Sequence, residues 1–229
     1  LEQDGSDYFA IVIRNVFTPE ECEGLIERSN EEVGYEPALL NVGRGRQVLD
    51  TAARKSDRCI LDDPNLAEDI WRRICTALDD LSGRQRDRLR LDILESQTTR
   101  QSVYPVGLNE RLRFLRYNPG DYFRVHADGC YVRSGEAGAD RRGERSLITC
   151  QVYLNEGFSG GATTLYSSVS GKGYDVVPET GSVLLFEHGL YHQGSQLLEG
   201  VKYAIRTDVM YTFKGEPGWE YSQKPLRLK

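Results

Sequence analysis

The stretch RFLRYNPGDYFRVHADG, residues 113–129, decides the fold together with FEHGLYHQGSQLLEGVKYAIR, residues 186–206. The first stretch consists of two short strand-like runs separated by Asn, Pro and Gly, and it ends in His-Ala-Asp. Side chains two positions apart on an extended strand point the same way, so His126 and Asp128 are predicted to share a face. With His192 from the second stretch, two imidazoles and one carboxylate could hold a divalent metal.

This set of ligands is typical of a particular chemistry. Two histidines and one carboxylate on one face of a metal form the facial triad of non-haem Fe(II) oxygenases, which leaves coordination positions open for a cosubstrate and O2. The H-x-D pattern alone is a weak signal, because such a pair more often makes an ordinary hydrogen bond. The chain has three histidines. We favour His192 over His188 as the third ligand and expect His188 near the surface or beside a ligand.

Two cations follow the last histidine. Lys202, Ala204 and Arg206 would share a face if residues 202–206 are extended. Burying a charge without a partner is costly, so an inward Lys202 and Arg206 would require an anion beside them. A dicarboxylate would meet that requirement. The alternative is a pair of cations on a solvated strand.

Composition favours one globular domain. The 229 residues carry a net charge of −6, and no basic stripe suits a nucleic-acid backbone. Five widely spaced cysteines without a C-x-x-C motif favour buried free thiols over disulfides or a thiolate zinc site. No apolar run is long enough to span a membrane, and residues 1–9 do not read as a secretory leader. We therefore expect a cytoplasmic protein, although the chain begins at Leu1 and a leader could precede it. The sequence does not determine the oligomeric state.

The first half of the chain predicts one strand and two helices. Residues 8–17 are β-branched and aromatic, as in a strand. Thr18 as N-cap, with Pro19 and Glu21 completing a capping box, predicts a helix whose apolar face is Cys22, Leu25 and Ile26. A second helix is predicted over residues 66–81, where Ile70, Ile74, Leu78 and Leu81 have helical spacing and Gly83 follows.

From about residue 111 the pattern changes to short strands. These are predicted at residues 111–118, 122–128, 146–155, 162–167, 174–178, 182–188 and 202–213. Such a series favours a sandwich, barrel or jelly roll with the helices packed outside one sheet. The Gly-rich, charged segment 133–145 directly follows the first two ligands and is a candidate lid.

Several motifs together resemble the Fe(II)/2-oxoglutarate dioxygenases of the prolyl 4-hydroxylase type, including the hypoxia-type prolyl hydroxylases. RYNPGDYFRVHAD is similar to their Y-x-P-G block with H-x-D, and TCQVYLNEGFSGGATTLY to their Y-L-N block with G-G. The spacing from His192 to Lys202 is similar to that of their distal histidine and its basic partner. The resemblance covers nearly the whole chain.

The resemblance implies a mostly β fold with helices, namely a double-stranded β-helix (jelly roll) over residues 105–229. Residues 1–104 would supply a strand and supporting helices, packed on the major sheet of the same globule. Fe(II) would be held by His126, Asp128 and His192, and the cofactors would be Fe(II), 2-oxoglutarate, O2 and ascorbate. The reaction implied is hydroxylation of an aliphatic C–H bond with release of succinate and CO2.

The resemblance also implies roles in binding 2-oxoglutarate. Lys202 would pair with its distal carboxylate, Tyr153 would donate to the same carboxylate, and Tyr117 would lie against the cosubstrate. Arg206 departs from many prolyl hydroxylases, which have a neutral residue there, so it could bind either cosubstrate or an anionic substrate. Thr164 and Leu165 are expected to line the same interior.

Other functions stay open at this point. A peptidyl residue and a small metabolite are both compatible substrates, since fold resemblance does not determine what is oxidised. A non-catalytic jelly-roll module that binds metal or ligand is the alternative. A nucleic-acid demethylase is disfavoured by the acidic charge balance, and no membrane partner is indicated.

Overall fold

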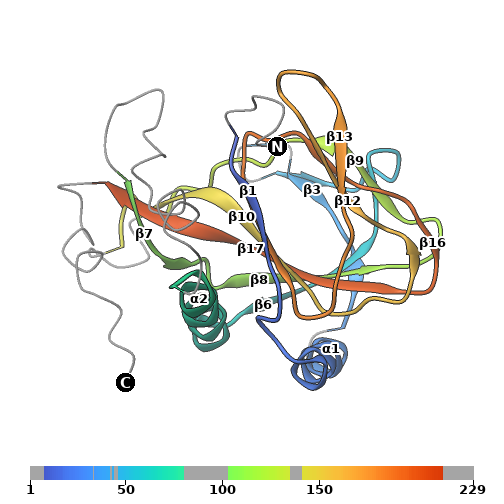
Figure 1. Cartoon of the computed structure of the whole chain (residues 1–229), viewed down its shortest axis with the longest axis horizontal. Helices are drawn as coiled ribbons and strands as arrows, with labels where there is room; N and C mark the ends of the chain where they lie inside the picture. The colour runs from blue at the N-terminus through green and yellow to red at the C-terminus, as the bar shows by residue number, and fades with distance from the viewer. Residues whose placement is uncertain are drawn as a thin grey trace.

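The computed structural model describes residues 8–32, 34–41, 43, 46–79, 103–134 and 141–213. This part of the chain is mostly β with two helices, consistent with a jelly roll (Figure 1). The elements are β1 (Ala10–Ile13), α1 (Pro19–Glu32), β2 (Glu36–Pro37), β3 (Leu40–Asn41), β4 (Gln47–Val48), β5 (Arg54–Lys55), β6 (Asp57–Asp62), α2 (Pro64–Asp79), β7 (Val103–Leu108), β8 (Arg111–Tyr117), β9 (Tyr122–His126), β10 (Arg145–Tyr153), β11 (Ser159–Gly160), β12 (Thr163–Tyr166), β13 (Gly173–Val176), β14 (Val183–Glu187), β15 (His192–Gly194), β16 (Leu197–Glu199) and β17 (Lys202–Phe213).

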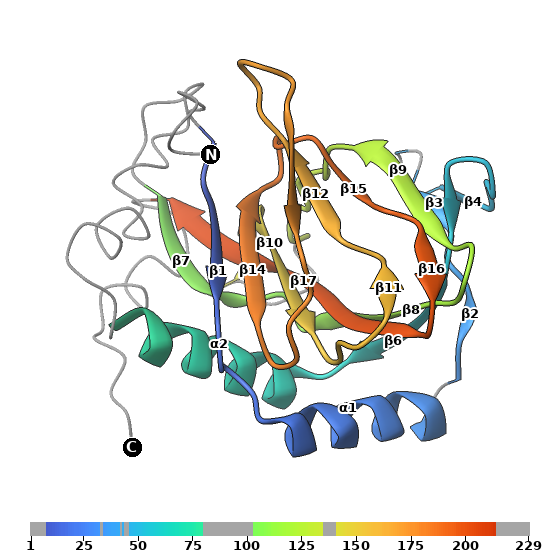
Figure 2. The ribbon, with the colours of Figure 1, turned by 45° about the vertical axis from the view of Figure 1, so that its right-hand side comes forward.

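Two antiparallel sheets form the body of the protein. The major sheet has the order β1-β14-β10-β17-β8-β6-β2, with β7 paired to β17. The minor sheet has the order β13-β12-β15-β9-β5. Figure 2 shows the minor sheet lying across the major one, with both helices on the opposite side of the major sheet. Short pairs β3-β4 and β11-β16 complete the architecture.

An apolar cluster joins the two sheets. Tyr153, Leu184, Phe186 and Ala204 from the major sheet are buried against Leu165 of β12. Because alternate residues of a strand point to opposite faces, the neighbours of these residues face the helices instead. The interior between the sheets is therefore built from every second residue of β10, β14 and β17.

A larger cluster fills the helix side of the major sheet. Ile70 and Ile74 of α2 and Cys22 of α1 are buried among residues such as Phe114 and Ile205. Leu25 and Ile26, the other residues predicted for the apolar face of α1, pack against this cluster as partly buried side chains.

A local capping signal confirms the predicted start of the first helix. The Thr18 hydroxyl accepts from the Glu21 amide at 3.3 Å, and the Glu21 carboxylate accepts from the Thr18 amide at 2.9 Å, which is the predicted capping box. The second helix begins at Pro64, two residues before the predicted start, because Asp63 caps it by accepting from the Leu66 amide. Leu81 and Gly83, predicted for its end, lie outside the described residues.

The strand predicted over residues 8–17 is shorter in the structure. β1 ends at Ile13, and Asn15 has a φ of 58°, which takes the chain out of the extended conformation. The amides of Val16 and Phe17 then donate to the Gly181 carbonyl at 3.0 and 3.1 Å. These hydrogen bonds to Gly181, which is distant in sequence, end the strand and direct the chain towards the start of α1.

The start of β17 is fixed by one side chain. The Asn155 amide donates to the Val201 carbonyl at 2.7 Å and accepts from the Tyr203 amide at 2.7 Å. These two hydrogen bonds enclose Lys202 and set which residues of β17 point between the sheets. Lys202, Ala204, Arg206 and Asp208 share that direction, whereas Tyr203, Ile205 and Val209 pack on the helix side.

The cysteines are free thiols, as predicted, but not all are buried. Cys22, Cys59 and Cys150 are buried, Cys75 is half-buried and Cys130 is exposed. Within the described ranges, neither helix is long and apolar enough to cross a membrane.

Candidate metal site

His126, Asp128 and His192 come together at one end of the interior between the sheets. Each can offer one ligand atom such that all three atoms lie within 4.8 Å of one another. The Cα atoms of His126 and His192 are paired across β9 and β15, so sheet pairing alone brings the two imidazoles side by side. Their ring centroids are 4.2 Å apart.

The predicted strand that carries His126 and Asp128 is two residues too long. β9 ends at His126, and Asp128 lies in the following loop, where its amide donates to the His188 carbonyl at 2.9 Å. The loop turns the Asp128 carboxylate back towards the histidines. Its Oδ1 lies 3.9 Å from Nε2 of His126, and its Oδ2 lies 3.7 Å from Nε2 of His192. The grouping expected from strand alternation is therefore achieved by a loop.

Both histidines are in the state that binds a metal. Nδ1 of His126 lies 2.7 Å from the Arg124 carbonyl, and Nδ1 of His192 lies 2.9 Å from the Leu190 carbonyl. A carbonyl only accepts hydrogen bonds, so each Nδ1 carries the hydrogen and each Nε2 keeps its lone pair. Burial lowers the pKa of His126 to about 4 and also lowers the pKa of His192. Both rings are neutral at pH 7.

The Asp128 carboxylate is held from two sides. Nη2 of Arg206 lies 3.0 Å from its Oδ1, and the Thr149 hydroxyl donates to its Oδ2 at 2.5 Å. Burial would raise the pKa of Asp128, but the charge of Arg206 and the other neighbours outweigh burial, so the pKa lies well below its usual range. The carboxylate is ionised and oriented before any metal binds.

Lys202 lies deeper in the interior and is 3% exposed. Its Nζ donates to the Gly161 carbonyl at 2.6 Å, and no carboxylate of the described residues lies within ion-pair distance. Burial lowers the pKa of Lys202 to about 7. Gly161 has a φ of 67°, and an added Cβ would lie 2.8 Å from Leu197, so only glycine fits beside this amine.

Two of the predicted tyrosines adjoin this amine. Nζ of Lys202 lies 5.4 Å from the ring centroids of both Tyr117 and Tyr153. Tyr153 is fully buried, and its phenol donates to the Thr163 hydroxyl at 2.8 Å. Lys202, Tyr117 and Tyr153 thus form one polar group beside the triad.

The expectation for Thr164 is wrong, whereas Leu165 does face the interior. The Thr164 hydroxyl donates to Asp175 at 2.6 Å on the other side of β12. Leu165 is buried beside Tyr153. Alternation along β12 places Thr163 instead of Thr164 on the inner face.

Arg206 belongs to a second charged group beside the triad. Its Nη2 lies 3.1 Å from Asp208, whose carboxylate also lies 3.3 Å from Nε2 of His188 and 3.7 Å from Nη1 of Arg113. Asp128 and Asp208 are thus the anions that accompany the inward Arg206. His188 is buried beside Asp208 and lies outside the group of three possible ligands, so the expected surface position is wrong. Its carbonyl accepts from the Asp128 amide, which agrees with the expected position beside a ligand.

Sequence reasoning missed several residues that reach the site, among them Thr149, Arg113 and Arg54. Thr149 lies four residues before Tyr153 on β10 and therefore faces the same side of the sheet. The inward direction expected for Tyr153 could thus have predicted that Thr149 also points inward. Arg113 and Arg54 gave no such signal. Arg113 reaches the site because β8 pairs with β17, where its Cα is the partner of Arg206. Arg54 does so because β5 pairs with β9, opposite Phe123.

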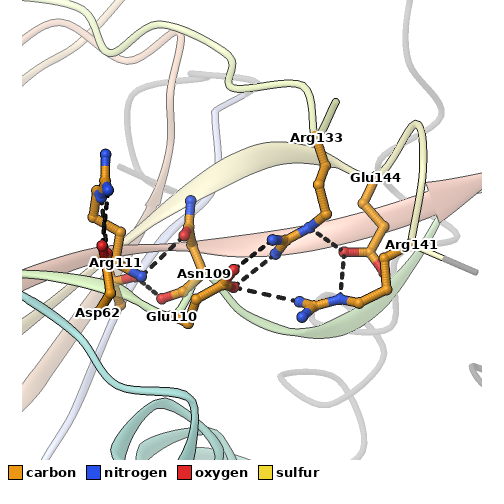
Figure 3. Close-up of polar contacts among 8 residues, drawn as sticks. Asp62, Asn109, Glu110, Arg111, Arg133, Arg141 and Glu144 are labelled. Carbon is orange, nitrogen blue, oxygen red and sulfur yellow. Dashed lines mark hydrogen bonds and ion pairs between the residues drawn. The ribbon is translucent and has the colours of Figure 1, made fainter. Parts of the chain in front are cut away.

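The described ends of the predicted lid, segment 133–145, are held by ion pairs (Figure 3). Arg133 is 3% exposed and its guanidinium binds Glu110 at 2.6 Å and Glu144 at 2.9 Å. Arg141 adds contacts to the same two carboxylates. Residues 135–140 lie outside the described residues, so the lid stays a prediction.

Comparison with known proteins supports the resemblance seen in the motifs. Residues 112–207 match the 2OG-Fe(II) oxygenase superfamily, which confirms the resemblance over that segment. A putative prolyl 4-hydroxylase of Acanthamoeba polyphaga mimivirus is 33% identical over 88 residues, or 38% of this chain. The match spans 35% of the mimivirus protein's length.

Solved structures agree with this chain in fold. A prolyl hydroxylase from Trichoplax adhaerens, in complex with a peptide fragment of the hypoxia inducible factor oxygen degradation domain, gives a TM-score of 0.58 at 14% identity. That comparison covers 97% of this chain and 90% of the other. A prolyl-4-hydroxylase from Pseudomonas putida gives a TM-score of 0.52 at 20% identity, covering 90% and 93% of the two chains. At these identities the likeness establishes the fold.

Proposed function

We propose that the protein is an Fe(II)- and 2-oxoglutarate-dependent dioxygenase that hydroxylates an aliphatic C–H bond and releases succinate and CO2. One observation carries the proposal: two neutral imidazoles and an ionised carboxylate converge beside a buried lysine that has no carboxylate partner among the described residues. The triad suits Fe(II), and the lysine suits the far end of a diacid bound to the same metal.

The donor set fits the metal that the resemblance implies. His126 and His192 would bind Fe(II) through Nε2, because each Nδ1 is engaged with a backbone carbonyl. Asp128 would supply the carboxylate ligand, which Arg206 and Thr149 already orient. When bound, Fe(II) and 2-oxoglutarate supply the oxidising chemistry that turns O2 and a C–H bond into a hydroxyl group.

The remaining residues bind and orient the cosubstrate. Lys202 would form an ion pair with the distal carboxylate of 2-oxoglutarate, and the Tyr153 phenol, now bonded to Thr163, would donate to the same group. Tyr117 would close the other side, since its ring is as close to Lys202 as that of Tyr153. Burial of all three side chains would exclude water from the cosubstrate.

The use of ascorbate and a cytoplasmic location stay predictions.

In this proposal, residues 105–229 form the double-stranded β-helix, and residues 1–104 support it and add β1, β6 and β2 to its major sheet. Two pairings support a single globule: β1 is hydrogen-bonded to β14, and β6 to β8, within the major sheet. The helices pack behind that sheet and keep β17 in place beneath the triad. A peptidyl substrate is favoured over a small metabolite by the peptide complex of the Trichoplax neighbour.

The proposal is tested by measuring iron binding and succinate release together. The purified protein is expected to bind one equivalent of Fe(II) and to convert 2-oxoglutarate slowly to succinate without added substrate. It should bind neither 2-oxoglutarate nor succinate tightly without metal. A protein that binds iron but never forms succinate, with any substrate tried, would instead be the non-catalytic module.

A further inference from the structure

The charges around the triad are unbalanced in a way that the proposed function leaves unexplained. Arg54 acts electrostatically on His126, and Arg113 and Arg206 interact with Asp128. With Lys202, the described part of the chain has four cationic side chains here, against the two carboxylates of Asp128 and Asp208. Fe(II) and dianionic 2-oxoglutarate would cancel each other, so two positive charges would remain.

Of the two arginines of this group that lie on the major sheet, Arg113 and Arg206, Arg113 has the poorer hydrogen bonding. Arg206 has two carboxylates at 3.0 and 3.1 Å, whereas the only carboxylate near Arg113 in the described part of the chain lies at 3.7 Å. Nη1 of Arg113 is buried without a hydrogen-bond partner among the described residues. Burial and the charge of Arg206 lower the pKa of Arg113 to about 10, so it is still a cation at pH 7. A buried donor of this kind costs free energy unless a ligand accepts from it.

Arg54 approaches the triad from the minor sheet. Its guanidinium lies 4.7 Å from the Phe123 ring centroid, and that ring stacks on His126 with 3.6 Å between centroids. Its Nε donates to Ser56 at 2.9 Å, and no carboxylate of the described residues is within ion-pair distance. Burial lowers the pKa of Arg54, and the charge of Arg206 contributes to the same direction. Through Phe123, Arg54 is thus placed beside the triad.

We propose that Arg113 and Arg54 bind an oxyanionic group of the primary substrate, so that the enzyme hydroxylates an acid. This inference rests on the proposed function and narrows its substrate class. Guanidinium groups bind carboxylate or phosphate through paired, charge-assisted hydrogen bonds, which would satisfy the free Nη1 of Arg113. Binding there places the anion beside His126 and Asp128, so that a C–H bond next to the acidic group faces the metal.

Matched pairs of compounds test the inference on the iron-loaded protein with saturating 2-oxoglutarate. One arm compares free L-amino acids with their C-terminal amides. A second compares blocked peptides containing Glu with the same peptides containing Gln, and a third compares phosphate monoesters with the parent alcohols. Binding is measured without O2 by the shift in melting temperature, and turnover by the rate of succinate release. The arm that responds identifies the source of the anion.

We expect the anionic member of at least one pair to bind and to stimulate succinate release, and its neutral partner to do so about 10- to 100-fold less. Arg113→Gln should remove this preference, and Arg113→Lys should restore part of it. Arg54→Gln is a second, independent variant with the same expected loss. Arg111→Gln is the matched control, because Arg111 lies on the same strand but pairs with exposed Asp62.

The outcomes separate the inference from the proposed function. Equal response to acids and their neutral partners in all three arms, with iron binding and basal succinate release intact, would overturn the inference alone. A preference for acids that persists in both the Arg113 and the Arg54 variants would also overturn it. Absence of iron binding and of basal succinate release would overturn the proposed function instead.

Discussion

Arg206 and Asp128 form an ion pair of 3.0 Å that joins strand β17 to the loop carrying the carboxylate of the triad. Thr149 holds the other oxygen of the same carboxylate. Partners that orient a metal ligand in this way commonly contribute 10- to 100-fold to metal affinity. We therefore propose that Arg206 positions Asp128, a role that differs from the two expected from sequence.

Replacing Arg206 by Met should weaken Fe(II) binding by about 10- to 100-fold, because Asp128 loses its main orienting partner. Arg206→Lys should recover part of the affinity. Iron titration without 2-oxoglutarate measures the effect, and Arg116→Gln is a control, since Arg116 pairs with Asp57 on the helix side of the sheet. Unchanged iron affinity with a raised KM for 2-oxoglutarate would make Arg206 a cosubstrate ligand instead.

His126→Ala or Asp128→Ala should abolish iron retention and succinate release, because each removes one of three ligand atoms that lie within 4.8 Å of one another. His188→Ala should keep measurable iron binding, since His188 contacts Asp208 from outside the ligand group. Iron content after gel filtration and turnover are the measurements. Substantial 2-oxoglutarate-dependent activity in either triad variant would exclude the assignment.

Lys202→Met should raise the KM for 2-oxoglutarate by the equivalent of about 2–4 kcal/mol, or roughly 30- to 1,000-fold, by removing the cation that would pair with the distal carboxylate. Initial rates of succinate release at varied 2-oxoglutarate give the value. Lys172→Met is the control, because Lys172 lies on the exposed β12–β13 turn over Tyr174. A KM that stays the same in Lys202→Met would contradict the proposed role.

Arg133→Gln should lower the free energy of unfolding by about 3–5 kcal/mol, because it leaves the buried Glu144 carboxylate without its closest cation. Denaturant unfolding of the metal-free protein measures this. Arg14→Gln breaks an exposed pair with Glu179 and should cost less than about 1 kcal/mol. An equal loss of unfolding free energy in the two variants would mean that burying the ion pairs of Arg133 adds nothing to stability.

The same network predicts a dependence of stability on pH. The hydrogen bond from Arg133 lowers the pKa of Glu110 to about 2, from 4.5 when unfolded. A depressed carboxyl pKa contributes stability that is fully present above about 4.5 and is lost as the pH falls towards 2. Glu110→Gln should therefore flatten the pH dependence of unfolding in that window. An unaltered slope between these values would show that other carboxyl groups dominate it.

Local sequence signals predicted the features that depend on neighbours in the chain. The capping box of Thr18 and Glu21 and the alternation that turns Lys202 and Arg206 inward both require only adjacent residues. Features that depend on distant pairing were not predictable in this way. β1 ends early because of the Gly181 carbonyl, and Arg54 reaches the triad because β5 pairs with β9.

The hydrogen bonds of Asn155 on either side of Lys202 have a consequence for mutation and evolution of this protein. Because β17 sends alternate residues to opposite faces, inserting or deleting a single residue just before it would send Tyr203 and Ile205 inward and the cations into the apolar layer behind. Length changes there would thus damage folding and chemistry at once, whereas insertions of two residues would preserve the phase. The side-chain amide of Asn155 thus determines which residues of β17 face the interior between the sheets.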